Sequence, residues 1–336
     1  MPISVIATVR NERDNISRLL DSLLSQSHKP DEILIVDGAS TDGTLDILQT
    51  YAKTHGILVL SQPCNIAEGR NLGIRAATGT HLAVTDAGCF VDADWLKEMV
   101  ACFQADPQID VVAGNFRFET RNDFEEAVVL ATFQPNRDET GAARFYPSSR
   151  SLALKKSAWV RAGGYPEWLY AAEDTLFNIR LRQIGCRFAF CKTAVVRWRP
   201  RETWSTLARQ RINFARGNGR VGIGSSGYAV NLRVHLAALA LIVASLWFPA
   251  LLLLAVAVLG RHVWHRLWPQ ATATTRGRPA LMRYRVLAVM EFVRLVSMYG
   301  YLLGRWDRAR DASFISNQQR YMGVGSVDEL EPDGVQ

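Results

Sequence analysis

The chain has 336 residues, a formal net charge of +7 and five cysteines. Its length exceeds one typical domain, and an odd number of cysteines without zinc-ligand spacing argues against a disulfide framework or a structural zinc site and favours a reducing compartment. The opening residues, MPISVIATV, have no basic stretch and run directly into a predicted strand, so we expect no signal peptide.

The charge is unevenly distributed along the chain. Residues 1–195 hold 20 Lys and Arg against 24 acids, residues 196–310 hold 18 Arg against 3 acids, and residues 311–336 hold 1 against 5. Such a basic block suits nucleic acid or anionic lipid. Residues 236–259 form an uncharged stretch of 24 residues within it, long enough for a helix to cross a hydrocarbon layer of about 30 Å. We therefore expect a membrane, and no nucleic acid, as a partner.

The first elements predict a β-α-β unit. Strands are expected at residues 4–9 and 33–36, and each ends in polar residues. A helix between them is indicated by apolar residues at a 3.6-residue period: Ile16, Leu19, Leu20, Leu23 and Leu24. A second helix should open at Thr41 or Asp42, which are good caps. Since ligands of an open parallel sheet bind beyond the carboxyl ends of its strands, we expect a nucleotide site there.

Several segments then follow in a fixed order: SVIATVRNE, IVDGASTDGT, AEGRNLGIRAATG, VTDAG, and later GGYPE with AAED. As an ordered set they resemble the family 2 glycosyltransferases of the GT-A fold, over roughly residues 1–220. The resemblance implies an α/β fold with a mostly parallel, mixed sheet flanked by helices. We divide the chain into a GT-A domain at 1–225, a membrane-associated helical region at 226–310 and an acidic tail at 311–336.

The resemblance implies residues that bind a nucleotide sugar donor. It points to Thr8, Glu12 and Asp37 for the nucleoside, with Asp37 contacting the base or ribose. Arg70 could reach the base or the phosphates with its always-charged guanidinium. Taken alone, Arg70 is more often a solvated helix residue.

The metal motif of the family, Asp-x-Asp after a strand, is incomplete here. Asp86 is present in HLAVTDAG, but Gly88 replaces the second acid. A divalent cation, Mg or Mn, can still be held by one carboxylate with substrate phosphates and water. Asp92 and Asp94 could assist, although capping of a helix at 95–103 is the favoured interpretation.

The resemblance assigns the catalytic base to Asp174, at the start of a predicted helix, and places Glu173 on the acceptor side. Neighbouring helical residues diverge by about 100°, so both carboxylates cannot face one acceptor atom. The alternative is that Asp174 is an N-cap and Glu173 a surface charge. A single displacement, in which Asp174 takes the acceptor proton and the diphosphate leaves toward Asp86, inverts the anomeric carbon.

Later residues are expected to shape the acceptor side. A Gly163-Gly164 turn lets backbone approach a sugar closely, and Trp168 and Tyr170 could stack on it or lie in the core. Family members that polymerise often carry Gln-x-x-Arg-Trp, whereas this chain reads RQRINFARGNGR. Arg209, Arg211 and Arg216 could instead contact diphosphate, a lipid-linked acceptor or lipid head groups.

The topology of the apolar stretch stays open between a single span and a re-entrant hairpin with Pro249 at its apex. Arg-rich segments on both sides favour the hairpin, because a span would place one of them outside. Residues 286–303 predict an amphipathic interfacial helix, with a second span as the alternative.

These features together predict an inverting transferase at the cytoplasmic face of the cell membrane. The donor would be a UDP-sugar, by resemblance, and the acceptor a lipid-linked saccharide or a polysaccharide. The alternative, motivated by Gly88, is a non-catalytic protein that binds nucleotide sugars as a scaffold. A nicotinamide dehydrogenase is excluded because no G-x-G-x-x-G follows the first strand.

Overall fold

The computed structural model describes residues 1–133 and 147–323, in two compact units. As far as they are described, residues 1–119, 138–199 and 320–323 form an α/β unit, and residues 120–137 and 200–319 form a helical unit. The expected boundary at 225 lies later than this division. The reason is that helix α8 (Trp204–Val221) packs along helix α12 (Ala280–Arg310) inside the helical unit.

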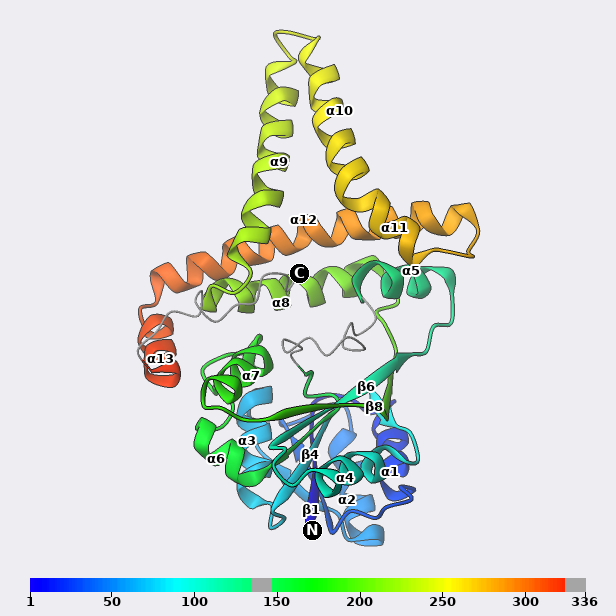
Figure 1. Cartoon of the computed structure of the whole chain (residues 1–336), viewed down its shortest axis with the longest axis vertical. Helices are drawn as coiled ribbons and strands as arrows, with labels where there is room; N and C mark the ends of the chain where they lie inside the picture. Colours follow the sequence, from blue (N-terminus) through cyan, green and yellow to red (C-terminus); the bar gives the residue numbers. More distant parts are fainter. Residues whose placement is uncertain (134–146, 324–336) are drawn as a thin grey trace. The chain divides into compact units, whose positions relative to one another are not determined.

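The α/β unit is built on one mixed sheet (Figure 1). Its strand order is β3-β2-β1-β4-β7-β6-β8-β5. Neighbouring strands β3, β2, β1 and β4 are parallel, as are β6 and β8, whereas β7 and β5 pair in antiparallel fashion. The strands are β1 (Ile3–Val9), β2 (Glu32–Asp37), β3 (Leu58–Ser61), β4 (His81–Asp86), β5 (Cys89–Val91), β6 (Val111–Phe118), β7 (Leu152–Lys155) and β8 (Phe188–Trp198). This architecture confirms the predicted α/β class.

Helices flank this sheet and close its core. They are α1 (Ile16–Leu24), α2 (Thr44–His55), α3 (Ile66–Ala76), α4 (Trp95–Ala105), α6 (Lys156–Ala162) and α7 (Glu173–Gln183). Helix α2 begins later than predicted, because Asp42 Oδ1 accepts bonds from Thr44 N (3.0 Å) and Thr44 Oγ1 (2.5 Å) and holds a turn ahead of it. One buried cluster joins the strands to α3, α6 and α7, among others through Ile6, Leu82, Leu154 and Phe177.

The helical unit is organised around α8 and α12, which run side by side (Figure 1). Three glycines allow their backbones to meet: a β-carbon on Gly219, Gly300 or Gly304 would lie closer than 3.0 Å to the opposite helix. Arg216 and Arg220 of α8 both pair with Asp307 of α12. The other elements are α5 (Asp123–Thr132), α9 (Ser225–Ala244), α10 (Leu251–His262), the π-helix η2 (Val263–Leu267), α11 (Trp268–Thr274) and α13 (Ser313–Met322).

The uncharged stretch at 236–259 is not one helix. It is divided between α9 and α10, which pack against each other as a hairpin (Figure 1). The helix expected at 286–303 extends over all of α12, and one of its faces packs in a cluster with α5, α8 and α11. By length and composition, α9 and α12 are the two described helices that are apolar enough to cross a membrane.

Candidate functional site

The predicted site residues from β2 and β4 lie on either side of β1, at the carboxyl ends of these strands. In the parallel register Val9 of β1 is opposite Asp37, and Thr8 is opposite Asp86. Asp37 and Asp86 are the last residues of their strands. The ends of three adjacent parallel strands therefore bring these predicted residues to one edge of the sheet, where such sheets bind ligands.

Two loops at this edge are tied together by hydrogen bonds. The Asn11 backbone N donates to Ser40 Oγ (2.9 Å), and Asn11 Oδ1 accepts from the Thr41 backbone N (2.8 Å). The Glu12 backbone N donates to Thr44 Oγ1 (2.9 Å). The polar runs RNE and GASTDGT thus form one ordered rim, a link that spacing along the chain did not predict.

Strained backbone is concentrated beside the candidate residues. Among the described residues, the non-glycine residues with positive φ are Asn11 (54°), Ala39 (57°) and Ala172 (66°). Asn11 precedes Glu12, Ala39 follows Asp37 by two positions, and Ala172 directly precedes Glu173. Left-handed backbone at such residues costs free energy and occurs mainly at functional sites. No signal in the sequence marks these alanines.

Asp37 lies deeper than the resemblance implied. It is fully buried, and its carboxylate accepts hydrogen bonds from the Ser40 backbone N (3.2 and 3.3 Å) and from Ser61 Oγ (2.8 Å). In this arrangement the carboxylate supports the loop that follows β2. The carboxylate is thus engaged by hydrogen bonds within the protein. Its expected direct contact with base or ribose stays a prediction.

Arg70 links the two carboxylates nearest to the predicted chemistry. It is 1% exposed; its Nη2 lies 2.6 Å from Asp86 Oδ1 and its Nη1 lies 2.8 Å from Glu173 Oε1. Burial by itself lowers the pKa of Arg70, but the charges of Asp86 and Glu173 outweigh it and raise that pKa. Arg70 is therefore not a solvated helix residue, and both its terminal nitrogens pair with carboxylates. Its expected contact with the base or the phosphates stays a prediction.

Arg70 reaches this position because α3 packs unusually close to β1. A β-carbon on Gly69 would lie 2.5 Å from Thr8 Cγ2, and one on Gly73 would lie 2.6 Å from Ile6 Cγ2. A capping box between Asn65 and Glu68 begins the helix and sets its entry. The glycines thus allow the helix backbone to approach the strand and bring the guanidinium to the sheet edge.

The Glu173-Asp174 pair separates into two environments. Glu173 is buried against Arg70, and burial together with the neighbouring Asp174 charge raises the pKa of Glu173 to about 7, although Arg70 lowers it. Asp174 is partly exposed and accepts a 2.7 Å bond from the Thr175 backbone N. The alternative in which Glu173 is a surface charge is wrong, because Glu173 is buried. Its place on the acceptor side stays a prediction, and Asp174 is the more exposed carboxylate of the pair.

The structure also explains Gly88. Its φ of +74° is a left-handed conformation that a larger residue adopts only with strain. A β-carbon built there would lie 4.0 Å from both carboxylate oxygens of Glu12. A carboxylate from the β1–α1 loop therefore lies next to the position from which the second acid of the motif would extend.

These residues fit a divalent cation whose coordination is shared with a substrate. Among the described residues, no cluster of three or more His, Cys, Asp and Glu side chains could hold a metal ion alone. Asp86 and Glu12 supply two carboxylates, which suits a cation completed by phosphates and water. Asp92 pairs with Arg197 and Asp94 accepts a 2.6 Å bond from Ser27 Oγ, so both are engaged elsewhere.

The predicted acceptor residue Gly164 has a clear structural role. Its φ is +79°, and a β-carbon there would lie 3.0 Å from Asn71 Oδ1. Its carbonyl accepts a 2.6 Å hydrogen bond from Tyr321 Oη, near the end of the described chain. Trp168 is half-buried, whereas Tyr170 is 60% exposed, which excludes a core role for Tyr170.

The remaining predicted acceptor residues, Arg209 and Arg211, lie on α8 of the helical unit. Arg209 is exposed, and the Arg211 guanidinium lies 5.4 Å from the centre of the Phe133 ring. Arg216 forms two hydrogen bonds with Asp307 (2.6 and 2.8 Å), and its expected contact with diphosphate, a lipid-linked acceptor or lipid head groups stays a prediction.

Comparisons with known proteins bear on this geometry. Residues 4–161 match the family model described as glycosyl transferase family 2. The chain is 26% identical over 225 residues to the glycosyltransferase AglE of Haloferax volcanii, a match that covers 65% of this chain and 73% of that protein. It is 25% identical over 228 residues to the poly-β-1,6-N-acetyl-D-glucosamine synthase of Staphylococcus aureus, and there it spans only 55% of the relative's length.

A solved structure shares the fold. The mannosyltransferase PcManGT of Pyrobaculum calidifontis, determined in complex with GDP-Man and Mn²⁺, superposes with a TM-score of 0.59. The match is 23% identical and covers 91% of this chain and 87% of that one. At this level of identity the likeness concerns the arrangement of the backbone.

Proposed function

This chain is a glycosyltransferase with a family 2 domain of the GT-A fold, and from this premise we propose that it moves a sugar from a nucleotide diphosphate sugar to an acceptor hydroxyl with inversion. The observation that carries the proposal is the linked set Asp86, Arg70 and Glu173, with Asp174 beside it, next to the ends of β1, β2 and β4. No observation favours the scaffold alternative, because the motif position left by Gly88 has a carboxylate next to it.

The proposed reaction is one displacement. The acceptor oxygen attacks the anomeric carbon while Asp174 takes the hydroxyl proton, and the bond from that carbon to the diphosphate oxygen breaks. The nucleoside diphosphate leaves with the bonding electron pair. Arg70 acts as a positioning residue that holds Asp86 and Glu173, so that the start of α7 and the carboxylate of Asp174 stay in place.

We assign metal binding to Asp86 together with Glu12. A bound divalent cation, Mg²⁺ or Mn²⁺, supplies positive charge next to the departing diphosphate. The support is the proximity of the Glu12 carboxylate to Gly88 and the partial exposure of Asp86. The binding of Mn²⁺ in the presence of a nucleoside diphosphate, measured by electron paramagnetic resonance, should weaken in Glu12→Gln and in Asp86→Asn while both proteins stay folded.

The donor and acceptor are proposed at the level of chemical class. The resemblance favours a UDP-sugar, and the neighbour bound to GDP-Man makes a guanosine donor the main competitor. The relatives are a glycosyltransferase and a polysaccharide synthase, which supports a lipid-linked saccharide or a polysaccharide as acceptor. Within the α/β unit, we place Gly164 and Trp168 on the acceptor side.

We further propose that the enzyme works at the cytoplasmic face of the cell membrane. The apolar helix α9, the apolar sequence of α10 and the arginine-rich sequence around them support this location. Arginine is enriched in cytoplasmic segments next to membranes, and anionic lipid attracts it.

The deciding experiment combines binding with product analysis. Purified full-length protein in detergent is screened against UDP-, GDP- and other nucleotide sugars for thermal stabilisation, with and without Mg²⁺ or Mn²⁺, because a ligand that binds the folded state raises its stability. Asp174→Asn should retain donor stabilisation and lose turnover, with Asp311→Asn, at an exposed position between α12 and α13, as matched control. A product with retained anomeric configuration would refute the mechanism.

A further inference from the structure

The uncharged arms of the hairpin formed by α9 and α10 are too short to cross a bilayer and long enough to reach its middle. Its uncharged arms, residues 236–244 and 251–259, rise about 1.5 Å per residue and are each about 13 Å long. The hydrocarbon core of a bilayer is about 30 Å thick, so one leaflet provides about half of that. A single arm matches one leaflet.

The turn between the arms pairs most of its backbone amide hydrogens internally. The amide N atoms of Ser245, Leu246, Trp247 and Phe248 donate to carbonyls in the last turn of α9, at 2.9 to 3.2 Å, and Pro249 has no amide hydrogen. Ser245 Oγ donates to the Ile242 carbonyl (2.6 Å). An unpaired polar group in hydrocarbon costs several kcal/mol, so a turn with these internal bonds is compatible with lipid.

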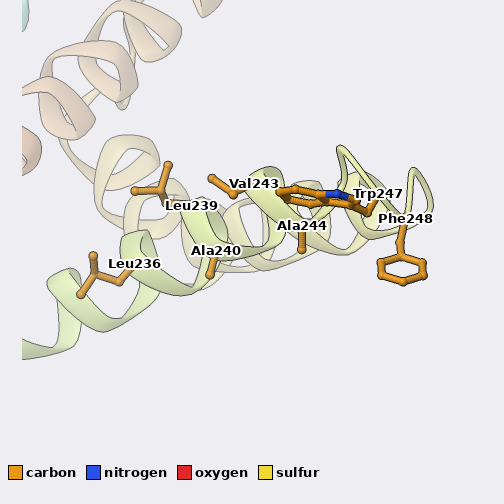
Figure 2. Close-up of a pocket in the computed structure, with 7 residues that line it drawn as sticks. All are labelled: Leu236, Leu239, Ala240, Val243, Ala244, Trp247 and Phe248. Atoms are coloured by element: carbon orange, nitrogen blue, oxygen red, sulfur yellow. The ribbon is translucent and has the colours of Figure 1, made fainter.

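The exposed side chains become most apolar at the closed end. Leu246 is 78% exposed, Trp247 71%, Phe248 68% and Leu253 75%. Figure 2 shows Trp247 and Phe248 at the turn, beyond Leu239 and Val243 on α9. Large apolar surface of this kind is costly in water. A transmembrane arrangement would require polar residues at this end, where the turn has none beyond the internally bonded Ser245.

The open end of the hairpin has the opposite character. Arg233 on α9 and Arg261 and Arg266 after the apolar arm are exposed. Trp264, 62% exposed, stacks on Trp268 with ring centres 5.9 Å apart. Tryptophan beside arginine is typical of the boundary between hydrocarbon and head groups, and arginine complements the negative charge of anionic lipids.

We propose that this hairpin inserts into one leaflet of a lipid bilayer as a re-entrant anchor, with Trp247 and Phe248 near the midplane and both arms returning to the same face. The occupant of the apolar surface is thus lipid, and the arginines at its open end contact anionic head groups. The inference deepens the proposed membrane location and rests on it. It places the start of the α9 arm at residue 236 and the end of the α10 arm at residue 259 at the same membrane face.

The depth of Trp247 tests the proposal. Full-length protein is reconstituted in vesicles of phosphatidylcholine and phosphatidylglycerol, and fluorescence is quenched by lipids brominated either near the head group or near the chain end. The signal of Trp247 is the difference between wild type and Trp247→Phe. We expect it to be lost mainly with bromine near the chain end. Trp264→Phe is the matched control, and its difference signal should be lost mainly with bromine near the head group.

Several results would overturn the insertion. Quenching of Trp247 by iodide confined to the far side of the vesicles would show a spanning segment, and quenching from the near side would show a tip in water. Insensitivity to every quencher would show that protein, such as a second copy of the chain, covers the tip. Transfer to a soluble acceptor analogue is measured on the same preparation, so a failure of the proposed enzymatic function is distinguished from a failure of insertion.

Discussion

Replacement of Arg70 by Met should destabilise the α/β unit more than any surface change. Methionine keeps most of the side-chain volume but removes the charge, and leaves Asp86 and Glu173, whose side chains are 15% and 8% exposed, without a cation. Breaking a buried ion pair from one side costs about 3–5 kcal/mol. For a unit of this size, that corresponds to a loss of roughly 6–20 °C in melting temperature. Uptake of a proton by Glu173, whose pKa is already raised, places the expected value toward the lower end.

Thermal unfolding of the full-length protein in detergent measures this loss, and a double-mutant cycle assigns it. Glu173→Gln, combined with Arg70→Met, should cost less than the sum of the two single changes, by about 0.5–3 kcal/mol. Arg70→Lys is the conservative control. The single nitrogen of lysine retains one of the two ion pairs, so the melting temperature of this variant should lie between those of the wild type and Arg70→Met. Additive effects, or a loss below about 1 kcal/mol in Arg70→Met, would refute the network.

Other features of the molecule lead to further expectations. The pKa of Glu173 is raised from 4.5 to about 7, so its contribution to stability is complete below pH 4.5 and lost as pH rises through 7. Glu173→Gln should therefore flatten the fall of melting temperature between pH 4.5 and 7. An unchanged pH dependence would contradict the assignment. Gly88→Asp should lower stability by about 1–2 kcal/mol because of its left-handed backbone, without tightening Mn²⁺ binding; tighter binding would argue against Glu12. Gly304→Val should force α8 and α12 apart and cost about 1–3 kcal/mol or more, whereas Gly260→Val, with open space around it, is the control. Tyr321→Phe removes one hydrogen bond to the Gly164 carbonyl and should lower the free energy of unfolding by about 1 kcal/mol. It should also lower kcat if the turn positions the acceptor. An unchanged kcat would give Tyr321 a purely structural role.

Local pattern predicted the elements whose neighbours are close in sequence. The helix at 16–24 and the strands around it follow from period and polarity, and the structure has them within a residue or two. Arg70 shows the limit: its partners are 16 and 103 residues away, so no spacing in its own helix indicates an ion pair. The buried state of Glu173 depends on the same long-range pairing, and a helix-start acid otherwise looks like a cap.

The later part of the chain was harder to read for a different reason. An uncharged run of this length has the composition of a single span, and a hairpin was indicated only by Pro249 and by the arginine-rich segments on both sides. The structure divides the run into two arms, because the amides of residues 245–248 bond to the last turn of α9 and end that helix there. The boundary at 199–200 likewise depends on glycine contacts between α8 and α12, which join residues about 80 to 90 positions apart and have no local signature.

The closeness of α3 to β1 has a consequence for redesign of this enzyme. With Gly69 and Gly73 packed against the Thr8 and Ile6 side chains, a larger residue at either glycine would push α3 away from the strand and displace the Arg70 guanidinium. Changes of substrate preference at the proposed donor site are better sought in residues 10–13 and 38–43, which hold each other by a few hydrogen bonds. Libraries aimed at the accepted nucleotide should randomise these loops and keep the two glycines.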